Sequence, residues 1–211
     1  MIAAQRLAMT KEEFQAVAGL SDAVVERLAI YAGLLQKWQK AINLVGPSTL
    51  ADPWRRHMLD SAQLLPHLPK PDAAVLDLGS GAGFPGLVLA VASQATLHLV
   101  ESDQRKAAFL NEVNRATQAG AMIHACRVET LEPFAVDVVT ARAFAPLDRL
   151  LACAEPFLRP ATVGLFLKGR NAERELTACR KRWNMAAKAI PSLSDETGVV
   201  LKLEGISRRH E

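Results

Sequence analysis

Hydrophobic and polar positions follow two different periods along this chain, and the change falls near residue 70. Between residues 10 and 67 the apolar side chains recur every three or four positions, which is the spacing of one face of a helix. After residue 70 the apolar residues form short, near-continuous runs with helical stretches between them. This change of pattern predicts a helical N-terminal part followed by an α/β part.

Three helices are expected in the N-terminal part. Thr10 and Glu13 have the spacing of a capping box ahead of the first helix, and Ser21 is placed to cap a second, longer one. The apolar positions of the second helix recur at helical spacing and are Val24, Leu28, Tyr31, Leu35 and Trp38. A third helix is predicted over roughly 49–65. Three prolines within 66–71 end it, because proline cannot continue a helix.

The runs beyond residue 70 predict a buried sheet. Strands are expected at 73–78, 96–102, 122–126, 136–143, 162–169 and 198–205, with another near 185–190. Helices are expected between most of them, at 86–93, 104–118, 147–158 and 170–183. Near-continuous apolar strands that alternate with helices are typical of a mainly parallel, twisted sheet with helices on both faces. We therefore expect a helical extension over residues 1–70 and an α/β domain over residues 71–211.

Composition limits the possible classes of protein. The chain has 211 residues, of which half are apolar, so it can bury a core without metals or disulfides. Its three cysteines are far apart and lack metal-ligand spacing, which favours reduced thiols and no structural metal. The pattern contains neither a signal peptide nor a membrane span. We expect a soluble, cytoplasmic monomer without membrane association.

The charge is mildly positive overall but unevenly distributed. The net charge is +3, whereas residues 168–182 alone carry +4. Further pairs of arginines occur at 55–56 and 208–209. A net charge of this size does not by itself indicate a nucleic-acid partner.

A glycine-rich loop follows the first predicted strand and opens a helix. Within "LDLGSGAGFPG" the four glycines are Gly79, Gly81, Gly83 and Gly86. Ligands of open α/β sheets bind beyond the carboxyl ends of the strands, and glycine lets a ligand approach the backbone closely. Two ligands fit this loop. One is a dinucleotide, because the last three glycines match GxGxxG; the other is S-adenosylmethionine.

Two acidic residues bear on this choice. The carboxylate of Asp77, two residues before the loop, repels a pyrophosphate and attracts the sulfonium and ammonium groups of S-adenosylmethionine. It can also brace the loop by accepting from glycine amides. Glu101 follows the second strand, twenty-two residues after Gly79, where an acid binds a ribose diol; Asp103 is an alternative, although it suits a helix cap better.

The segment after the third predicted strand has two interpretations. In this architecture adenine would pack there, so that Val128 touches the ring and Glu129 accepts from its exocyclic amine. The alternative is an ordinary solvent-facing loop.

Several linked motifs extend this picture. They are "LDLGSGAGFPG", "LVESDQRKAAFL", "RVET", "VVTARAFAPL" and "FLKGRNAEREL", with "WQKAINLV" and "RRHMLDS" upstream. Over roughly residues 20–180 the chain resembles the bacterial small-subunit rRNA guanine-N7 methyltransferases (RsmG, also called GidB). The resemblance implies a Rossmann-like class I methyltransferase domain with an N-terminal helical extension. It also implies methyl transfer from S-adenosylmethionine to N7 of a guanine, nucleotide 527 in the family's numbering, in 16S rRNA of the small ribosomal subunit or its assembly intermediate.

The resemblance also assigns contacts by position. Matched cofactor contacts are Gly79, Phe84, Val128, Glu129 and Arg142. Together with the residues argued from their chemistry, the predicted cofactor site consists of Asp77, Gly79, Gly81, Gly83, Phe84, Glu101, Val128, Glu129 and Arg142.

N7 of guanine exposes a lone pair and carries no proton, so no general base is expected, only groups that position the base. We assign that catalytic role to Arg142 and Lys168. Arg142 would hold O6, a phosphate or the surroundings of the cofactor, or else form a salt bridge with Asp77 or Glu101. Basic residues commonly hold RNA phosphates; the candidates are Lys168, Arg170, Arg55 and Arg56.

Other residues and other functions remain open at this point. His57 and Asp60 lie one turn apart on the third predicted helix and face either the cleft or the helix packing. Trp38 and Trp54 stack on bases or, more commonly, anchor helices. The competing functions are an NAD(P)-dependent dehydrogenase that uses "GAGFPG" and a non-catalytic RNA-binding protein.

Overall fold

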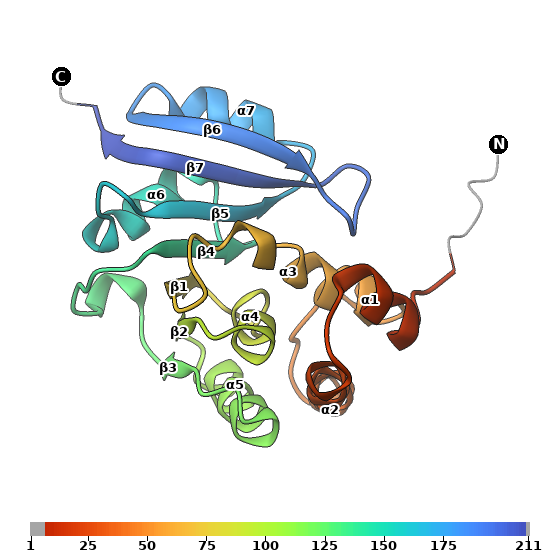
Figure 1. Ribbon diagram of the computed structural model, residues 1–211. Coiled ribbons are helices and arrows are strands. Elements are labelled where there is room, and N and C mark those ends of the chain that lie inside the picture. Colours follow the sequence, from red (N-terminus) through yellow and green to blue (C-terminus); the bar gives the residue numbers. More distant parts are fainter. Residues whose placement is uncertain (1–6, 210–211) are drawn as a thin grey trace.

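The computed structural model describes residues 7–209 and contains a central seven-stranded sheet (Figure 1). The strands are β1 (Ala74–Leu78), β2 (Thr96–Val100), β3 (Met122–His124), β4 (Val138–Arg142), β5 (Val163–Lys168), β6 (Trp183–Pro191) and β7 (Val199–Arg208). Their order across the sheet is β3-β2-β1-β4-β5-β7-β6. The first five strands pair in parallel, whereas β7 runs antiparallel to both β5 and β6. All seven strands expected from the sequence are present, including β6.

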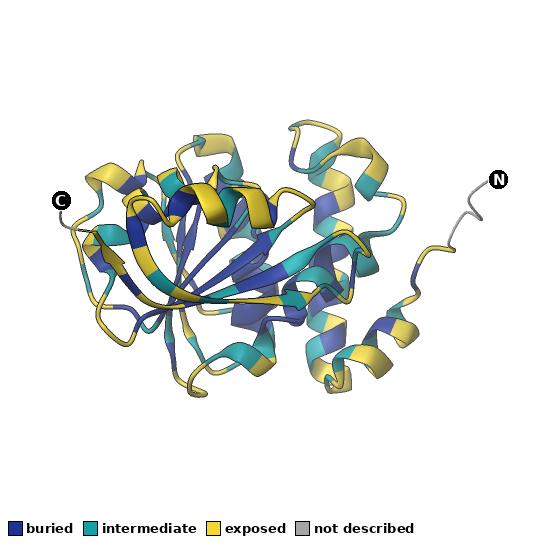
Figure 2. Cartoon of the chain, turned by 90° about the horizontal axis from the view of Figure 1, so that it is seen from above, coloured by how far each residue is buried: buried dark blue, intermediate teal, exposed yellow. Residues whose placement is uncertain are grey.

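Helices cover both faces of the sheet, as predicted. They are α1 (Lys11–Ala18), α2 (Asp22–Gln39), α3 (Asp60–Ala62), α4 (Gly86–Ala92), α5 (Gln104–Thr117), α6 (Leu147–Ala154) and α7 (Ala172–Cys179). α7 ends before the expected limit of 183, because Trp183 already begins β6. The buried strands lie in the interior, and the helices turn exposed faces outward (Figure 2).

The alternation of side chains along each strand explains why the apolar runs are nearly continuous. Successive side chains point to opposite faces of a sheet. On β1, Val75 joins a cluster with α2, α4 and α5, while its neighbour Leu76 joins a second cluster with α6 and α7. Val138 and Val139 of β4 divide between the clusters in the same way. The central strands β1 and β4 therefore fill two cores at once.

The N-terminal helices belong to the first of these two cores. Phe14 and Leu28 lie in the same cluster as Leu87 and Phe109, and α2 packs against α4 and α5. Residues from both sides of the predicted boundary near 70 therefore share one hydrophobic core.

The two tryptophans of the N-terminal part anchor helices. The Trp38 ring lies 5.7 Å from that of Phe109, and the Trp54 ring lies 5.2 Å from that of Phe14. Both pack against the first core cluster.

The third predicted helix differs from the expectation. Instead of one α-helix over 49–65, the chain forms a 3₁₀ turn (Pro47–Thr49), a π-helix (Trp54–Leu59), the short α3 and a second 3₁₀ turn (Leu65–His67). Apolar spacing indicates a helix but does not distinguish its hydrogen-bond period. Single π-helical turns occur frequently at functional sites, and two residues of this one, Arg56 and His57, line the cavity described below.

Among residues 7–209, no helix combines the length and apolar character needed to cross a bilayer. The same residues contain no group of three or more His, Cys, Asp or Glu side chains arranged to hold a metal ion. Cys126, Cys153 and Cys179 are free.

Candidate functional site

A cavity of about 950 Å³ lies where the carboxyl ends of the parallel strands meet the N-terminal helices. In Figure 1, β4 and β5 end beside α3, and the turn between β6 and β7 projects towards the same place. The predicted site residues that line the cavity are Gly79, Gly81, Phe84, Glu101, Val128, Glu129, Arg142, Lys168 and Arg56. The predicted residues outside its lining are Asp77, Gly83, Arg55 and Arg170.

The glycines of the loop serve two different purposes. Gly79 and Gly83 have φ values of 63° and 92°, which side chains other than glycine rarely adopt. A Cβ at Gly79 would collide with the ring of Phe144 in the cavity, whereas a Cβ at Gly83 would lie 2.6 Å from the hydroxyl oxygen of Tyr31 on α2. Gly79 therefore leaves room for the Phe144 ring in the cavity wall, while Gly83 allows the loop to pack on α2.

Asp77 lies beneath the loop and is fully buried. Its Oδ2 accepts from the Gly86 amide at 3.3 Å and its Oδ1 from the Thr140 hydroxyl at 3.0 Å. The bracing role considered from the sequence is thus present. Burial raises the pKa of Asp77 to about 6. Any attraction to a bound cation would act through the loop rather than by contact.

Glu101 connects the ends of β1 and β2. Its Oε2 accepts from the Gly81 amide and its Oε1 from the Asp103 amide, both at 2.8 Å. Each carboxylate oxygen has two acceptor positions, so a diol in the cavity can bind to the same side chain. Asp103 caps α5 by accepting from the Arg105 and Lys106 amides, which was its expected role.

Val128 and Glu129 lie at the rim of the cavity on a 3₁₀ turn, Val128–Thr130. Val128 is buried and belongs to the second core cluster. Glu129 is exposed and lies 3.7 Å from Arg127. An apolar wall beside an exposed carboxylate suits the adenine contact expected here.

Arg142 connects the end of β4 to the π-helix. Its Nη1 donates to the Arg56 carbonyl at 3.0 Å and to Asp60 Oδ2 at 3.3 Å, and its guanidinium lies 4.8 Å from the centre of the Phe84 ring. The alternative considered from the sequence, a salt bridge of Arg142 with Asp77 or Glu101, was wrong, because the carboxylate partner of Arg142 is Asp60. These two residues are 82 positions apart, and only the folded chain brings them together.

His57 is the second partner of Arg142. Its Nδ1 accepts from Arg142 Nη1 at 3.0 Å. That contact places the proton on Nε2, which donates to the Thr49 hydroxyl at 2.9 Å. Burial, together with the charges of Arg142 and Arg56, lowers the pKa of His57 to about 3. The imidazole is therefore neutral, with both nitrogens engaged, and it stacks on Phe84 at 4.8 Å.

The turn between β6 and β7 forms another wall of the cavity; we call residues 192–198 the hairpin loop. Arg56 Nη1 lies 2.6 Å from Asp195 Oδ2. The hydroxyl of Ser194 donates to Asp60 Oδ1 at 2.5 Å, and the Leu193 amide donates to Gln63 Oε1 at 2.8 Å. These contacts hold the hairpin loop to the π-helix and α3.

The remaining predicted basic residues have different surroundings. Lys168 Nζ donates to the Ala145 carbonyl at 2.9 Å and to Glu175 Oε2 at 2.8 Å, so it ties the chain after β4 to α7. Arg55 pairs with Asp52 at 2.9 Å, away from the cavity. Arg170 is exposed beyond the end of β5.

Phe144 and Asp195 line the cavity but were missed by the sequence analysis. For His57 and Asp60 the sequence left open whether they face the cleft or the helix packing, and both line the cavity. His57 and Asp60 carried a signal, because they lie three positions apart in "RRHMLDS". Nothing near Asp195 distinguishes it from other loop carboxylates.

Comparisons with known proteins give a consistent result. The family model described as "GidB: rRNA small subunit methyltransferase G" matches residues 24–200. "Ribosomal RNA small subunit methyltransferase G" of Rhodospirillum rubrum is 54% identical over 200 residues, covering 95% of this chain and all of that protein. The protein of the same name from Paramagnetospirillum magneticum is also 54% identical, covering 95% and 98% of the two chains.

Solved structures confirm the fold. A TehB-like SAM-dependent methyltransferase from Corynebacterium glutamicum superposes with a TM-score of 0.57 at 13% identity, covering 84% of this chain and 99% of that one. An O-methyltransferase from Bacillus cereus in complex with SAH has a TM-score of 0.57 at 12% identity, covering 92% and 100%. The Rossmann-like class I methyltransferase fold expected from the sequence is therefore confirmed.

Proposed function

Since this chain belongs to the rRNA small subunit methyltransferase G family, we propose that it transfers the methyl group of S-adenosylmethionine to N7 of a guanine in 16S rRNA, nucleotide 527 in the family's numbering. The observation that supports this function best is the cavity, in which bare glycine backbone, Glu101 and Arg142 converge. Family membership sets aside the NAD(P)-dependent dehydrogenase considered from the glycine motif.

The residues of the cavity fit the cofactor. Gly79 and Gly81 present backbone to the cavity, and the Phe144 ring lies so close to Gly79 that a Cβ there would collide with it. In this proposal Glu101 binds the ribose diol, while Val128 and Glu129 contact the adenine. When bound, S-adenosylmethionine supplies an electrophilic methyl group on a positively charged sulfur.

The chain positions the base rather than deprotonating it. His57 is the obvious candidate for a base, yet its Nδ1 already accepts from Arg142 and its Nε2 proton is donated to Thr49. N7 needs no base, because its lone pair is free. Methylation makes the guanine cationic, so Arg142, which lies over Phe84 of the glycine loop, serves better in the surroundings of the cofactor than at N7. Orientation of this kind contributes on the order of 7–11 kcal/mol in favourable cases.

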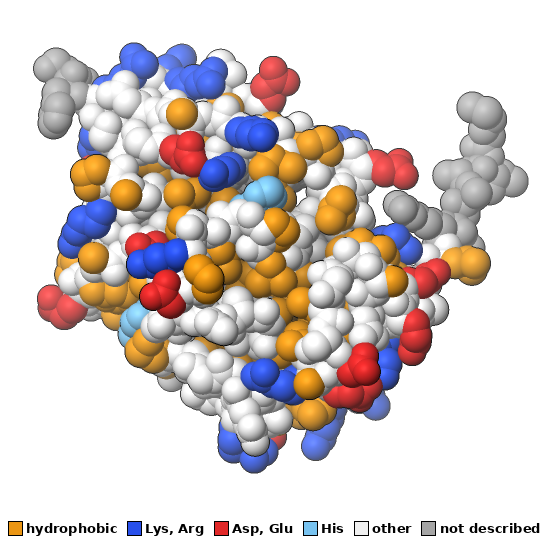
Figure 3. All heavy atoms as spheres, viewed as in Figure 1, with side chains coloured by type: hydrophobic (Ala, Val, Ile, Leu, Met, Phe, Trp, Pro, Cys, Tyr) orange, Lys and Arg blue, Asp and Glu red, His pale blue; other side chains and the backbone are white. Residues whose placement is uncertain are grey.

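Basic side chains beside the cavity suit an RNA substrate. In Figure 3, Lys and Arg side chains gather along the upper edge, over the region of α7. We assign phosphate contacts to Arg170 and its neighbours on α7, and a place at the cavity mouth to Arg56. Lys168 would act indirectly, by holding the chain after β4. Arg55 receives no RNA contact here, because it pairs with Asp52.

The decisive experiment is methyl transfer followed by nucleoside analysis. Purified protein is incubated with labelled S-adenosylmethionine and with naked 16S rRNA, assembling particles or mature small subunits from cells that lack the protein. We expect 7-methylguanosine in at least one of these substrates. Label in another nucleoside would contradict the N7 assignment. RNA binding without any transfer would support the non-catalytic alternative.

We further propose that the protein acts as a cytoplasmic monomer, without membrane association. Analytical ultracentrifugation of the purified protein tests the monomer, and cell fractionation tests the compartment.

A further inference from the structure

The ion pair of Arg56 and Asp195 is more accessible than the neighbouring ion pair of Arg142 and Asp60. The side chains of Arg56 and Asp195 are 40% and 33% exposed, whereas those of Arg142 and Asp60 are only 19% and 17% exposed. Arg56 comes from the π-helix and Asp195 from the hairpin loop, so the pair joins two walls of the cavity. A substrate that enters the cavity can reach both side chains.

After the hydrogen bonds within the protein are counted, Arg56 and Asp195 still have unused donor and acceptor positions. Asp195 Oδ1 accepts twice from Thr197, from its amide at 2.8 Å and its hydroxyl at 2.9 Å. Oδ2 accepts from Arg56 Nη1 alone among residues 7–209, so it keeps one acceptor position. The Arg56 side chain donates from Nη1 alone within the same residues and keeps further N–H groups. The pair thus offers a donor beside an acceptor.

Contacts recorded around the pair place it close to the glycine loop. The carbonyl of Arg56 accepts from Arg142, and Arg142 lies over the ring of Phe84 in that loop. Arg56 and its partner Asp195 are therefore linked through Arg142 to the glycine loop, which is the predicted site of the methyl donor.

A donor beside an acceptor matches one edge of guanine. Guanine presents its O6 acceptor next to its N1–H donor. Adenine presents the reverse, an N6 donor next to an N1 acceptor. We propose that Arg56 donates to O6 and Asp195 accepts from N1–H, so that the pair selects guanine over adenine while N7 remains unobstructed. This inference rests on the proposed function.

Strong hydrogen bonds from Arg56 and Thr197 lower the pKa of Asp195 to about 2. The carboxylate is accordingly an acceptor throughout the physiological range, as the proposal requires. A protonated carboxyl would present a donor and would lose the match to N1–H.

The test uses RNA with one replaced nucleotide at the methylated position. Guanine, inosine, 1-methylguanine and adenine are compared by kcat/KM for methyl transfer. Inosine keeps O6, N1–H and N7, so we expect it to react about as well as guanine. 1-Methylguanine lacks the N1–H donor, and we expect a loss of roughly tenfold to a hundredfold. Adenine is expected to be rejected more strongly.

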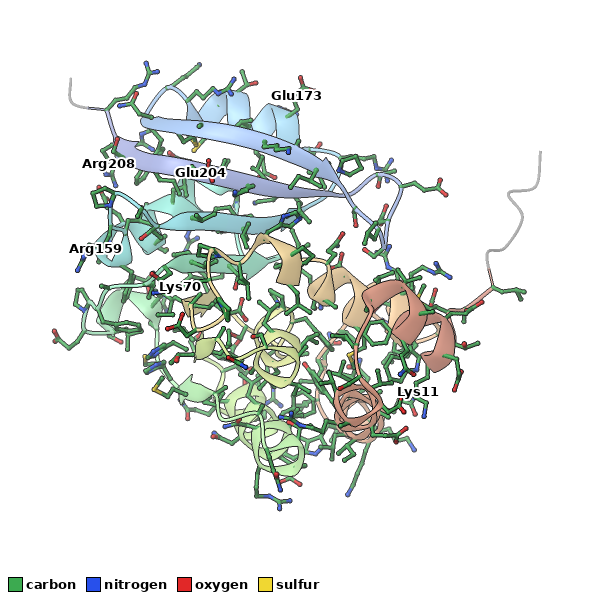
Figure 4. The ribbon with its side chains drawn as sticks, in the orientation of Figure 1. Lys11, Lys70, Arg159, Glu173, Glu204 and Arg208 are labelled. Atoms are coloured by element: carbon green, nitrogen blue, oxygen red, sulfur yellow. The ribbon has the colours of Figure 1, made fainter. Side chains whose placement is uncertain are left out.

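The Asp195→Ala variant identifies the group responsible. In this variant guanine and 1-methylguanine should react at similar rates, because the acceptor is gone. The matched control is Glu204→Ala on β7, a carboxylate in a 2.7 Å ion pair with Lys202 outside the cavity and labelled in Figure 4. This control should discriminate as the unmodified protein does. S-adenosylmethionine affinity, measured by calorimetry, verifies that both variants fold.

Two outcomes would overturn the inference. One is that Asp195→Ala lowers kcat/KM for guanine and for 1-methylguanine by the same factor relative to the unmodified protein. A purely structural role of Asp195 would produce this result. The other is an unmodified protein that accepts 1-methylguanine as readily as guanine. A protein that methylates no guanine-containing RNA at all contradicts the proposed function itself, and the inference with it.

Discussion

At the scale of single residues, Gly79 and Gly120 share a backbone conformation but differ in surroundings. Their φ values are 63° and 71°. A Cβ at Gly79 would collide with Phe144, whereas one at Gly120 meets open space. We expect Gly79→Ala to weaken S-adenosylmethionine binding at least tenfold, because the displaced ring enters the cavity. Isothermal titration calorimetry measures this affinity.

Gly120→Ala is the matched control, because both variants force alanine into the left-handed region at a cost of about 1–2 kcal/mol. Its stability should fall by this amount while its affinity for S-adenosylmethionine stays unchanged. Equal losses of affinity in the two variants would show that backbone strain, and not the cavity wall, accounts for the effect.

The buried carboxyl of Asp77 leads to a prediction about pH. Its pKa is about 6 in the folded protein, whereas an aspartate in an unfolded chain titrates near 3.9. Between about pH 4 and pH 6 the folded state retains a proton that the unfolded state has released. The unfolding free energy should therefore fall by about 3 kcal/mol in total as the pH rises from about 4 to about 6. Above about pH 6 the titration of Asp77 should cause no further change in the unfolding free energy.

Urea unfolding of the unmodified protein and of Asp77→Asn across pH 4–8 isolates this contribution. The asparagine variant cannot titrate at this position. The difference in unfolding free energy between the two proteins should therefore change with pH between about pH 4 and pH 6. Parallel profiles would mean that Asp77 titrates normally in the folded protein.

What the sequence reveals about the site depends on how far apart the interacting residues lie along the chain. Gly79 and Glu101 directly follow strands, and Val128 lies in the loop after β3, so topology alone brings them to one edge of the sheet. The partner of Arg142 could not be found in this way, because Asp60 belongs to a segment whose packing is set by a shared core. Asp195 was missed because nothing in its sequence neighbourhood distinguishes it from other loop carboxylates.

At the scale of secondary-structure elements, two helix starts that look equivalent in the sequence differ in the structure. Thr10 accepts from the Glu13 amide at 3.1 Å and its own amide donates to Glu13 at 2.8 Å, so the predicted capping box of α1 is confirmed. Ser21 occupies the corresponding position of α2 but makes no capping bond with its side chain.

Thr10→Ala should consequently lower the unfolding free energy by about 1 kcal/mol. Ser21→Ala should change it by less than about 0.5 kcal/mol. Urea denaturation followed by circular dichroism compares the two. Similar losses for both would mean that Ser21 stabilises α2 in a way that its hydrogen bonds do not reveal.

The elements themselves were easier to predict than their details. Strands buried on both faces, such as β1 and β4, produce near-continuous apolar runs and were recognisable for that reason. The strand near 185–190 was also expected, although most of β6 is not buried. The π-helix at Trp54–Leu59 was not, because its apolar positions resemble those of an α-helix. The interrupted helix matters for function, since it carries Arg56 and His57 into the cavity.

At the scale of the whole molecule, the predicted division at residue 70 can be tested against the shared core. Trp38 packs on the cluster that joins the N-terminal helices to the sheet, and Trp183 is buried in the cluster on the opposite face. Because α2 covers α4 and α5, separating the N-terminal helices would expose the core beneath them. We expect both regions to unfold together.

Variants that retain only Trp38 or only Trp183, with the other tryptophans changed to phenylalanine, report on these two regions by fluorescence. Their urea midpoints should coincide. S-adenosylmethionine at a hundred times its Kd should then raise the unfolding free energy by about 2.7 kcal/mol for both reporters, because a ligand at the glycine loop stabilises everything that unfolds with it. A Trp38 transition at lower urea that S-adenosylmethionine does not shift would instead mean that residues 1–70 form a separate domain. In that case the contacts of Arg56 and His57 with Arg142 would break before the sheet unfolds.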